Sequence, residues 1–443
     1  MGRLLVIGGG AAGSAAALAL HKAGFDVTVY EAHPDAAEDI GAFLTLASNG
    51  MRALAQIDAA PAVTALGFPL TGMRMFDGSG TERAARPLGE AEDPTLRYRC
   101  LRRGDLNTAL QAEAARRGIP VRHGARLVSV HEGADSVTAH FADGGTATGD
   151  LLIGADGLNS TVRRSIAPTA RPRYAGERVF YGRTTDAPRL GATDVITFIR
   201  GTSVAFGHTA SPEGETYWFA RVAAGDPLTP EEIAHGTPAR HRDLLVPLLR
   251  EDATPAAAIV AATADDILVT NATELPRGMP WRSARCLLIG DAAHAASPAT
   301  GQGASMALED AVILAKALRD APDRDTALTT YEHLRRPRVE HNITVSGDIS
   351  RGTHTRPAAP RGSTAVPLQL FDQFPVAGAA GGAGGQPVTA GTVTGMLPRV
   401  ALEHGQIRWA AAPSSAAVSW STPPSSSSAR RPARTHRRHR GGG

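Results

Sequence analysis

The sequence is poor in cysteine and aromatic residues, and it has no long apolar run. Its 443 residues include two cysteines, Cys100 and Cys286, too few for a disulfide framework. Cys286 lies in an apolar run typical of a buried strand, so we expect two reduced thiols in a cytoplasmic protein. The apolar run at 15–20 is too short to span a bilayer, and no signal-peptide pattern precedes Arg3, so we expect no membrane partner.

Lysine is nearly absent, and the positive charge is concentrated at one end of the chain. Lys22 and Lys316 are the only lysines among 46 basic residues, a bias that GC-rich codons explain without any special guanidinium chemistry. Residues 352–443 contain ten arginines and two acidic residues, a net charge of +8, which leaves −5 for residues 1–351. The basic balance therefore belongs to the end of the chain, and we predict no nucleic-acid partner.

The same end of the chain is biased in composition. Stretches such as AGAAGGAGG, PSSSS and RRPARTHRRHRGGG have low complexity and little periodicity, which predicts disorder over much of 352–443. We favour a dispensable tail. The alternative is a nucleic-acid-binding arm at 430–443, whose binding would weaken with added salt.

What the sequence does contain is an alternation of strand-like and helix-like segments. Residues 3–31 follow a strand, turn, helix, strand rhythm, which argues for a parallel sheet covered by helices. An amphipathic helix is predicted over 104–118, followed by a hairpin and the buried strand LLIG. Residues 170–275 are β-rich, with aromatic residues alternating with polar ones, which indicates an inserted antiparallel sheet. A long helical region follows from Ser305 to about 351.

Three glycines in the first turn match the spacing Gly-x-Gly-x-x-Gly. Gly8 permits the tight turn, Gly10 lets the backbone approach a pyrophosphate, and Gly13 allows the helix to pack closely on the strand. The helix start offers free N–H groups and a partial positive charge. Glu31 ends the second strand, where its carboxylate can accept ribose hydroxyl protons. The segment predicts a nucleotide site, against the alternative of a purely structural turn.

Two later strands also end in an acidic residue. The first leads into Asp156-Gly157, which on its own could be a simple turn with Ser160 as a helix cap. The second leads into Asp291, and His294 follows it. A histidine beside a turn of small residues is more often a packing or hydrogen-bonding residue than a catalytic one.

Taken together, these segments resemble the FAD-dependent monooxygenases of the p-hydroxybenzoate hydroxylase type, which are single-component aromatic hydroxylases. The resemblance spans about residues 3–345 and rests on GGGAAG with Glu31, on Arg103 and Leu106 of RRGDL, on GADGLNSTVR, and on GDAAHAASPATGQG. The central β-rich region carries almost none of it.

The resemblance implies a set of cofactor-binding residues. Glu31 would hold the adenosine ribose, Arg103 would lie along the FAD, and Asp291 would bond a ribityl hydroxyl. Gly157 and Arg163 belong to a motif associated with both FAD and NAD(P)H. The predicted FAD-binding residues are Gly8, Gly10, Ala12, Gly13, Glu31, Ala32, Thr45, Arg103, Leu127, Asp156, Asp291, Gly301, Gln302, Gly303, Ala304 and Ser305.

The segment Gly301 to Ser305 has a physical role of its own in this reading. A helix N-terminus aimed at the pyrimidine edge of the flavin offers backbone N–H groups and about half a positive charge to the anion that forms on reduction. Gly301 and Gly303 let the backbone approach the ring without a Cβ in the way. Many relatives have Asn in place of Ser305, so a side-chain contact there is not implied. An ordinary helix start is the alternative.

Pattern and resemblance together predict an α/β fold. We expect a Rossmann-like, three-layer FAD-binding domain, an inserted antiparallel-sheet substrate domain, a helical C-terminal part and a tail. The expected boundaries are 1–170 and 276–351 for the FAD-binding domain, 171–275 for the substrate domain, and 352–443 for the tail.

The resemblance also implies a reaction. NAD(P)H would reduce FAD, O2 would add to the reduced ring, and a flavin hydroperoxide would oxidise a small aromatic or polycyclic substrate. Because the cofactor carries the chemistry, neither a catalytic triad nor a metal site is expected. The chain has one dinucleotide motif, which agrees with NAD(P)H docking transiently. A flavin-dependent reductase or epoxidase on the same scaffold is the alternative. The halogenase signature Trp-x-Trp-x-Ile-Pro is absent.

The substrate is expected between the flavin and the central sheet. Residues on neighbouring strand positions face opposite ways, so about half of any candidate set must point elsewhere. His208 or Tyr217 could assist deprotonation of a phenolic substrate. The candidate lining residues are Tyr181, Arg183, His208, Tyr217, Trp218 and Arg221.

Overall fold

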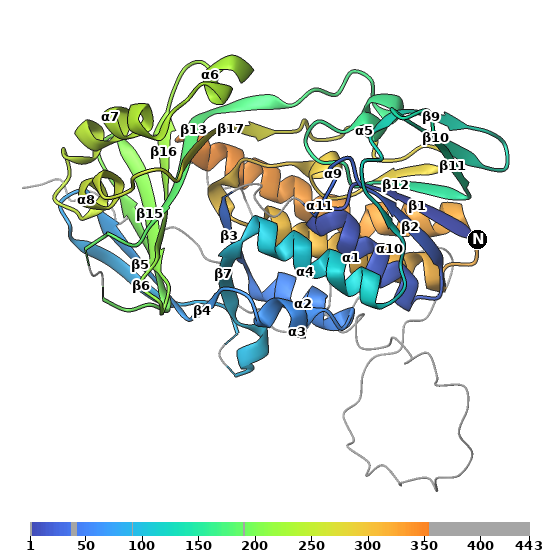
Figure 1. Cartoon of the computed structure of the whole chain (residues 1–443), viewed down its shortest axis with the longest axis horizontal. Coiled ribbons are helices and arrows are strands. Elements are labelled where there is room, and N and C mark those ends of the chain that lie inside the picture. The colour runs from blue at the N-terminus through green and yellow to red at the C-terminus, as the bar shows by residue number, and fades with distance from the viewer. Residues whose placement is uncertain (1, 37–41, 91, 189–190, 354–443) are drawn as a thin grey trace, which may run out of the picture. The chain divides into compact units, whose positions relative to one another are not determined.

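A five-stranded parallel sheet lies in the part of the fold that contains the N-terminus (Figure 1). The computed structural model describes residues 2–36, 42–90, 92–188 and 191–353. The strand order is β18-β12-β1-β2-β8, and every neighbouring pair is parallel. The strands are short runs of apolar residues, buried on both faces where they are central: β1 Arg3–Ile7, β2 Asp26–Tyr30, β8 Val121–Arg122, β12 Leu151–Gly154 and β18 Cys286–Leu288.

Different layers cover the two faces of this sheet. The helices α1 (Ala11–Lys22) and α10 (Gly303–Asp320) pack against one another on one face. A three-stranded antiparallel sheet covers the other and contributes Val137 and Phe141 to the same core. Its order is β11-β10-β9, with β9 Leu127–Glu132, β10 Val137–Phe141 and β11 Thr146–Gly149. The predicted three-layer, Rossmann-like arrangement is confirmed.

The remaining helices of this half surround the sheet and its connections. The predicted helix over 104–118 is α4, and the predicted C-terminal helical region is α10 followed by the long helix α11. The bounds are α2 Ser48–Gln56, α3 Ala60–Thr64, α4 Arg103–Arg116, α5 Thr161–Ile166, α9 Asp291–His294 and α11 Arg324–Ser350.

A seven-stranded sheet forms the second part, in the order β17-β13-β16-β15-β14-β5-β6. Its pairs are antiparallel except for the parallel pair of β14 and β5. Five strands come from the region predicted to be β-rich, and β5 and β6 come from residues 72–87. The bounds are β5 Gly72–Asp77, β6 Glu82–Pro87, β13 Arg173–Thr184, β14 Val195–Arg200, β15 Val204–Ala210, β16 Thr216–Ala223 and β17 Ile267–Glu274.

The two faces of the seven-stranded sheet have different partners. One face packs against the helices α7 and α8, with Trp218 and Phe206 at the centre of that core (Figure 1). The opposite face meets the small sheet β3-β7-β4 through Phe68 and Tyr217. The elements concerned are α6 Pro230–Ala234, α7 Pro238–Leu249, α8 Ala256–Ala261, β3 Phe43–Leu46, β4 Phe68–Leu70 and β7 Tyr98–Arg102.

The predicted tail at 352–443 lies outside the described residues from position 354 onward. Among the described helices, none combines the length and the apolar character needed to cross a bilayer. Both cysteines, Cys100 and Cys286, are buried as free thiols. Burial raises the pKa of the Cys286 thiol to about 12, so this side chain behaves as a small core residue.

Candidate active site

The three glycines of the first turn serve three different purposes. Gly8 has a left-handed backbone (φ 103°), and a Cβ there would lie 2.4 Å from the Ala155 carbonyl oxygen. A Cβ on Gly13 would lie 1.8 Å from the Gly8 carbonyl oxygen, so helix and turn pack too closely for a side chain. A Cβ on Gly10 would meet nothing within 4 Å. Space is therefore open only at the glycine expected to face a pyrophosphate, which fits a bound dinucleotide.

Glu31 and the glycine-rich turn are joined by hydrogen bonds. The Gly9 N–H donates to Glu31 Oε2 (2.5 Å), and the His33 N–H donates to Oε1 (2.7 Å). The Gly9 carbonyl accepts from Gln111 Nε2 (2.7 Å) and from Ser14 Oγ (2.8 Å). Each carboxylate oxygen has a second lone pair, so Glu31 can still accept a ribose hydroxyl.

Gln111 is a residue that the sequence analysis missed. It lies two turns into α4 and is 6% exposed, and its amide fixes the Gly9 peptide. A glutamine inside an amphipathic helix gives no sequence signal of such a contact.

The remaining predicted residues near Glu31 lie as follows. The Ala125 N–H donates to the Glu31 carbonyl (2.8 Å), which brings the chain just before Leu127 to the nucleotide motif. The Leu127 side chain is buried in the core, so only its backbone is available to a ligand. Ala32 follows Glu31 and is partly exposed, and Arg103 is exposed at the first position of α4.

Asp156 serves the helix that follows it. Asp156 Oδ2 accepts the Thr161 N–H (2.7 Å) and the Val162 N–H (3.1 Å), and its Oδ1 accepts from Ser160 Oγ (2.5 Å). Ser160 Oγ in turn accepts the Arg163 N–H (2.8 Å), so Ser160 is the helix cap of α5. Burial raises the pKa of Asp156 despite these bonds. Both oxygens hold α5, and Oδ1, which accepts one hydrogen bond, keeps a lone pair, so the cofactor contact of Asp156 stays a prediction.

Arg163 links two parts of the site. Its guanidinium donates to the Ala292 carbonyl (3.1 Å) and to the Leu158 carbonyl, and its side chain is buried. It therefore ties α5 to the short helix α9, which begins at Asp291.

The chain from Asp291 to Ser305 brings several predicted residues together. Asp291 Oδ1 lies 4.0 Å from the position of a Cβ on Gly303. Gly301 is left-handed (φ 64°), and a Cβ there would lie 3.5 Å from Thr45 Oγ1. The first hydrogen bond of α10 runs from the Met306 N–H to the Gln302 carbonyl (2.9 Å), so the amides before it belong to the free helix start.

Three neighbours of this helix start have packing roles. Ser305 is fully buried, and its hydroxyl accepts the Ala47 N–H (3.0 Å), which joins α10 to the start of α2. Ala12 lies against Gly290, where a Cβ would approach the Ala12 Cβ to 2.8 Å. Ala304 packs against the main core, and Gln302 Nε2 donates weakly to the Tyr98 hydroxyl (3.5 Å).

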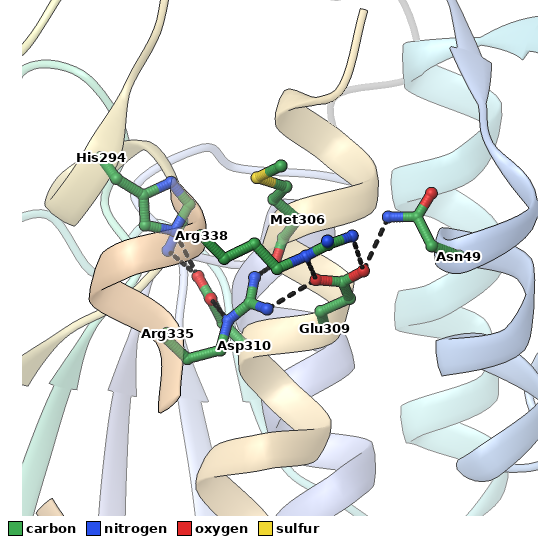
Figure 2. Close-up of polar contacts among 8 residues, drawn as sticks. Asn49, His294, Met306, Glu309, Asp310, Arg335 and Arg338 are labelled. Carbon is green, nitrogen blue, oxygen red and sulfur yellow. Dashed lines mark hydrogen bonds and ion pairs between the residues drawn. The ribbon is translucent and has the colours of Figure 1, made fainter. Parts of the chain in front are cut away.

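A cluster of buried charges lies behind the helix start (Figure 2). Asp310 accepts from His294 Nε2 (2.5 Å), from the Gly290 N–H (2.9 Å) and from Arg335 Nε (2.7 Å). Against the effect of burial, the interactions with His294 and Arg335 lower the pKa of Asp310 to about 2. His294 is 4% exposed and bonded to Asp310, so it is a hydrogen-bonding residue of the fold.

The six candidate substrate residues divide between the two faces of the seven-stranded sheet. Cross-strand pairing places Tyr181 opposite Phe219 and Arg183 opposite Tyr217, on the face toward β3. His208 pairs with Trp218 on the face covered by α7 and α8. Trp218 Nε1 donates to Thr263 Oγ1 (2.9 Å) on that side.

His208 is therefore misplaced for the role suggested for it. Its ring lies beside Phe206, which belongs to the core between the sheet and the helices α7 and α8. Burial lowers the pKa of His208 to about 4. The expectation that His208 or Trp218 lines the substrate is corrected by the alternation of strand residues, which sends both to the helix-covered face.

On the face toward β3, polar groups are held in pairs. The Tyr217 hydroxyl donates to Glu215, and Arg183 Nη1 donates to Glu215 Oε1 (3.0 Å). Arg221 makes two hydrogen bonds to Glu177, at 3.0 and 2.9 Å. Burial raises the pKa of Tyr181 to about 12 and that of Tyr217 above its usual range, so both phenols are neutral donors near neutral pH.

The comparison with known families decides the class of this chain. Residues 3–346 match the family described as FAD binding domain. The chain belongs to this family. Its glycine turn, Glu31 and the helix start at Gly303 are the parts of the fold that agree with a bound FAD. The chain is an FAD-dependent monooxygenase, as the functions of its relatives show.

Three relatives illustrate the match. The chain is 30% identical over 355 residues to the aurachin C monooxygenase/isomerase of Stigmatella aurantiaca, covering 79% of this chain and 88% of that protein. It is 32% identical over 343 residues to the FAD-dependent urate hydroxylase of Klebsiella pneumoniae, covering 76% and 86%. The structure of Klebsiella pneumoniae HpxO complexed with FAD and uric acid superimposes with a TM-score of 0.71 at 28% identity, covering 83% and 90%.

Proposed function

We propose that this monooxygenase hydroxylates a small aromatic substrate, with NAD(P)H as a transient electron donor and O2 as the source of the oxygen atom. One strand carries the proposal. Phe43 and Thr45 of β3 are two positions apart, so their side chains share a face. The centroid of the Phe43 ring lies 5.4 Å from that of Tyr217 and 6.2 Å from that of Tyr181. Thr45 lies against Gly301. The aromatic face of the sheet and the helix start expected to face the flavin therefore meet at β3.

The residues of this face suit an aromatic ring with polar substituents. Phe43, Tyr181 and Tyr217 offer edge-to-face packing for a ring. The Tyr181 hydroxyl lies near the positive charges of Arg103 and Arg221, which favour an electron-rich or anionic substituent. The names of several relatives agree with this class: one is a urate hydroxylase, one is a 3-amino-4-hydroxybenzoate 2-monooxygenase, and one is a 2-heptyl-3-hydroxy-4(1H)-quinolone synthase.

Bound FAD would supply the redox chemistry and the activation of O2. Asp291 would hold the ribityl chain, and the free amides at Gly303 to Ser305 would stabilise negative charge on the pyrimidine edge. The packed face around Phe43 would keep water from the reacting atoms. Tyr217 would orient the substrate, and because its hydroxyl donates to Glu215, a substrate proton could pass through it to that carboxylate.

The test is a substrate screen with product analysis. The protein is saturated with FAD and tested with phenols, hydroxybenzoates and nitrogen heteroaromatics for stimulated oxidation of NADH and NADPH. We expect at least one compound to stimulate oxidation and to gain one oxygen atom. Stimulated oxidation that yields only hydrogen peroxide, or a product that gains two hydrogens, would contradict hydroxylation and would favour a reductase. An epoxide product would place the chain with the epoxidases.

A further inference from the structure

We infer that Asp310 is a positioning residue that fixes both halves of the flavin-binding segment at once. Asp310 is fully buried about two turns inside α10, and its hydrogen bonds go to Gly290, His294 and Arg335. The inference rests on the proposed placement of the flavin at Asp291 and at the start of α10.

The first half that Asp310 fixes is the turn before Asp291. Its Oδ2 accepts the N–H of Gly290 (2.9 Å) and contacts His294 Nε2 (2.5 Å), so one oxygen holds both ends of the segment that carries Asp291 (Figure 2). Gly290 has a left-handed backbone (φ 57°). The Gly290 N–H is buried, so losing its bond to Asp310 would leave a buried donor without an acceptor, which is costly.

The second half is the start of α10 itself. Asp310 Oδ1 accepts from Arg335 Nε (2.7 Å), and the same guanidinium donates to the Met306 carbonyl (3.0 Å) in the first turn of the helix. Arg335 Nη1 also donates to Glu309 Oε2 (2.5 Å), whose other oxygen accepts from Asn49 Nδ2 (2.7 Å) on α2. The cluster therefore connects α11, the helix start and α2 through polar and charged side chains.

These connections give the buried charges of Glu309, Asp310 and Arg335 a role in the fold. A buried ion pair adds little net stability compared with apolar packing, but its directional bonds define one arrangement. Here the bonds fix the position of Asp291 relative to the start of α10. A flavin that binds to both needs this relative position to stay constant.

A double-mutant cycle tests the inference. The variants are Asp310→Asn, Asp291→Asn and the double variant, and the measurement is the Kd for FAD in the full chain. Coupling through such networks amounts to a change of roughly 2- to 30-fold. We expect D310N and D291N each to weaken FAD binding by this order, and the double variant to bind less weakly than the two effects combined would require, because part of the effect of D310N acts through the placement of Asp291.

Asp252→Asn is the matched control. Asp252 is also a buried carboxylate, and it accepts the Thr202 N–H (3.0 Å) and the Thr202 hydroxyl (2.8 Å) beside the seven-stranded sheet. D252N is expected to lower thermal stability and to leave the Kd for FAD unchanged. The circular dichroism of the bound flavin at saturating FAD should change in D310N and not in D252N.

The outcomes separate the inference from the proposed function. A D291N variant that binds FAD normally would contradict the placement of the flavin, and the inference would fall with it. A weakened D291N together with a D310N variant within twofold of wild type, or with effects that add in the double variant, would overturn the inference alone. If D310N does not fold, His294→Phe enters the same cycle, where a weaker, non-additive effect is expected and an unchanged Kd contradicts the inference.

Discussion

The two large sheets of this protein are specified in different ways. In the parallel sheet, β1, β12 and β18 are short apolar runs that each end at a recognisable turn, so each part of the nucleotide site has its own local pattern, although the parts lie far apart in the sequence. In the seven-stranded sheet, β5 and β6 carry no such pattern, and β5 joins the sheet by pairing with a distant segment, as Val195 pairs with Gly72. The comparison indicates that the cofactor half is encoded by local motifs, whereas the substrate half depends on long-range pairing.

The largest predicted effect tests the local half. Gly13→Ala places a Cβ 1.8 Å from the Gly8 carbonyl oxygen, so the helix or the turn must move. We expect a loss of about 3 kcal/mol or more in the free energy of unfolding, and no retained FAD. Urea unfolding and flavin absorbance after gel filtration measure both quantities.

Gly10→Ala is the matched control for this change. The added Cβ meets no protein atom within 4 Å, so stability should stay within about 1 kcal/mol of wild type. Because the open space is where the pyrophosphate is expected, FAD affinity should fall by about tenfold or more. Equal destabilisation of G10A and G13A would contradict the assignment of their separate roles.

The second prediction concerns His208 in the long-range half. Its folded-state pKa is lowered by burial to about 4 from 6.5, so below 6.5 the unfolded chain binds a proton that the folded chain does not. Stability present above 6.5 is therefore lost as the pH falls toward 4, by up to about 1.4 kcal/mol per pH unit.

Urea unfolding of wild type and His208→Phe at about pH 7.5, 6 and 5 measures this loss. The variant should lose less stability on acidification, and its hydroxylation at neutral pH should match that of wild type. A variant that folds but no longer hydroxylates would contradict the placement of His208 away from the substrate.

The third prediction separates the side chain of Ser305 from its backbone. Ser305→Ala leaves the buried Ala47 N–H without its acceptor, which should cost about 1–3 kcal/mol of stability. The backbone amides of the helix start are unchanged, so the Kd for FAD should stay within a few-fold of wild type. A large loss of FAD affinity at unchanged thermal stability would show that the hydroxyl contacts the flavin.

The smallest predicted effect is at Tyr217. Tyr217→Phe removes the hydroxyl that donates to Glu215 but keeps the ring contacts with Phe43 and Phe68. We expect kcat/KM for a phenolic substrate to fall by about 10- to 100-fold, and FAD affinity to change little. The effect should be smaller for a substrate without an ionisable hydroxyl, and equal effects on both substrates would argue against proton transfer.

Some elements of the fold could be predicted from the sequence, and others could not. The main parallel strands, the hairpin and the helix start were predictable because each has a local pattern, as at Gly8 and Gly303. The strands at 72–87 were missed because GMRMFD and ERAARP are short and lack a clear apolar alternation. Their place is set by pairing, of β5 with β14 and of β6 with β5. Likewise, the face on which His208 lies is set by cross-strand register, which no local pattern reveals.

The central claim is that the chain transfers one oxygen atom from O2 to an aromatic substrate with the help of FAD. The most direct measurement is the mass of the product formed from FAD-loaded protein, NAD(P)H and a stimulating aromatic compound under 18O2. The account predicts a product that carries one atom of 18O. A product without 18O, or one that differs from the substrate only by two hydrogens, would contradict it.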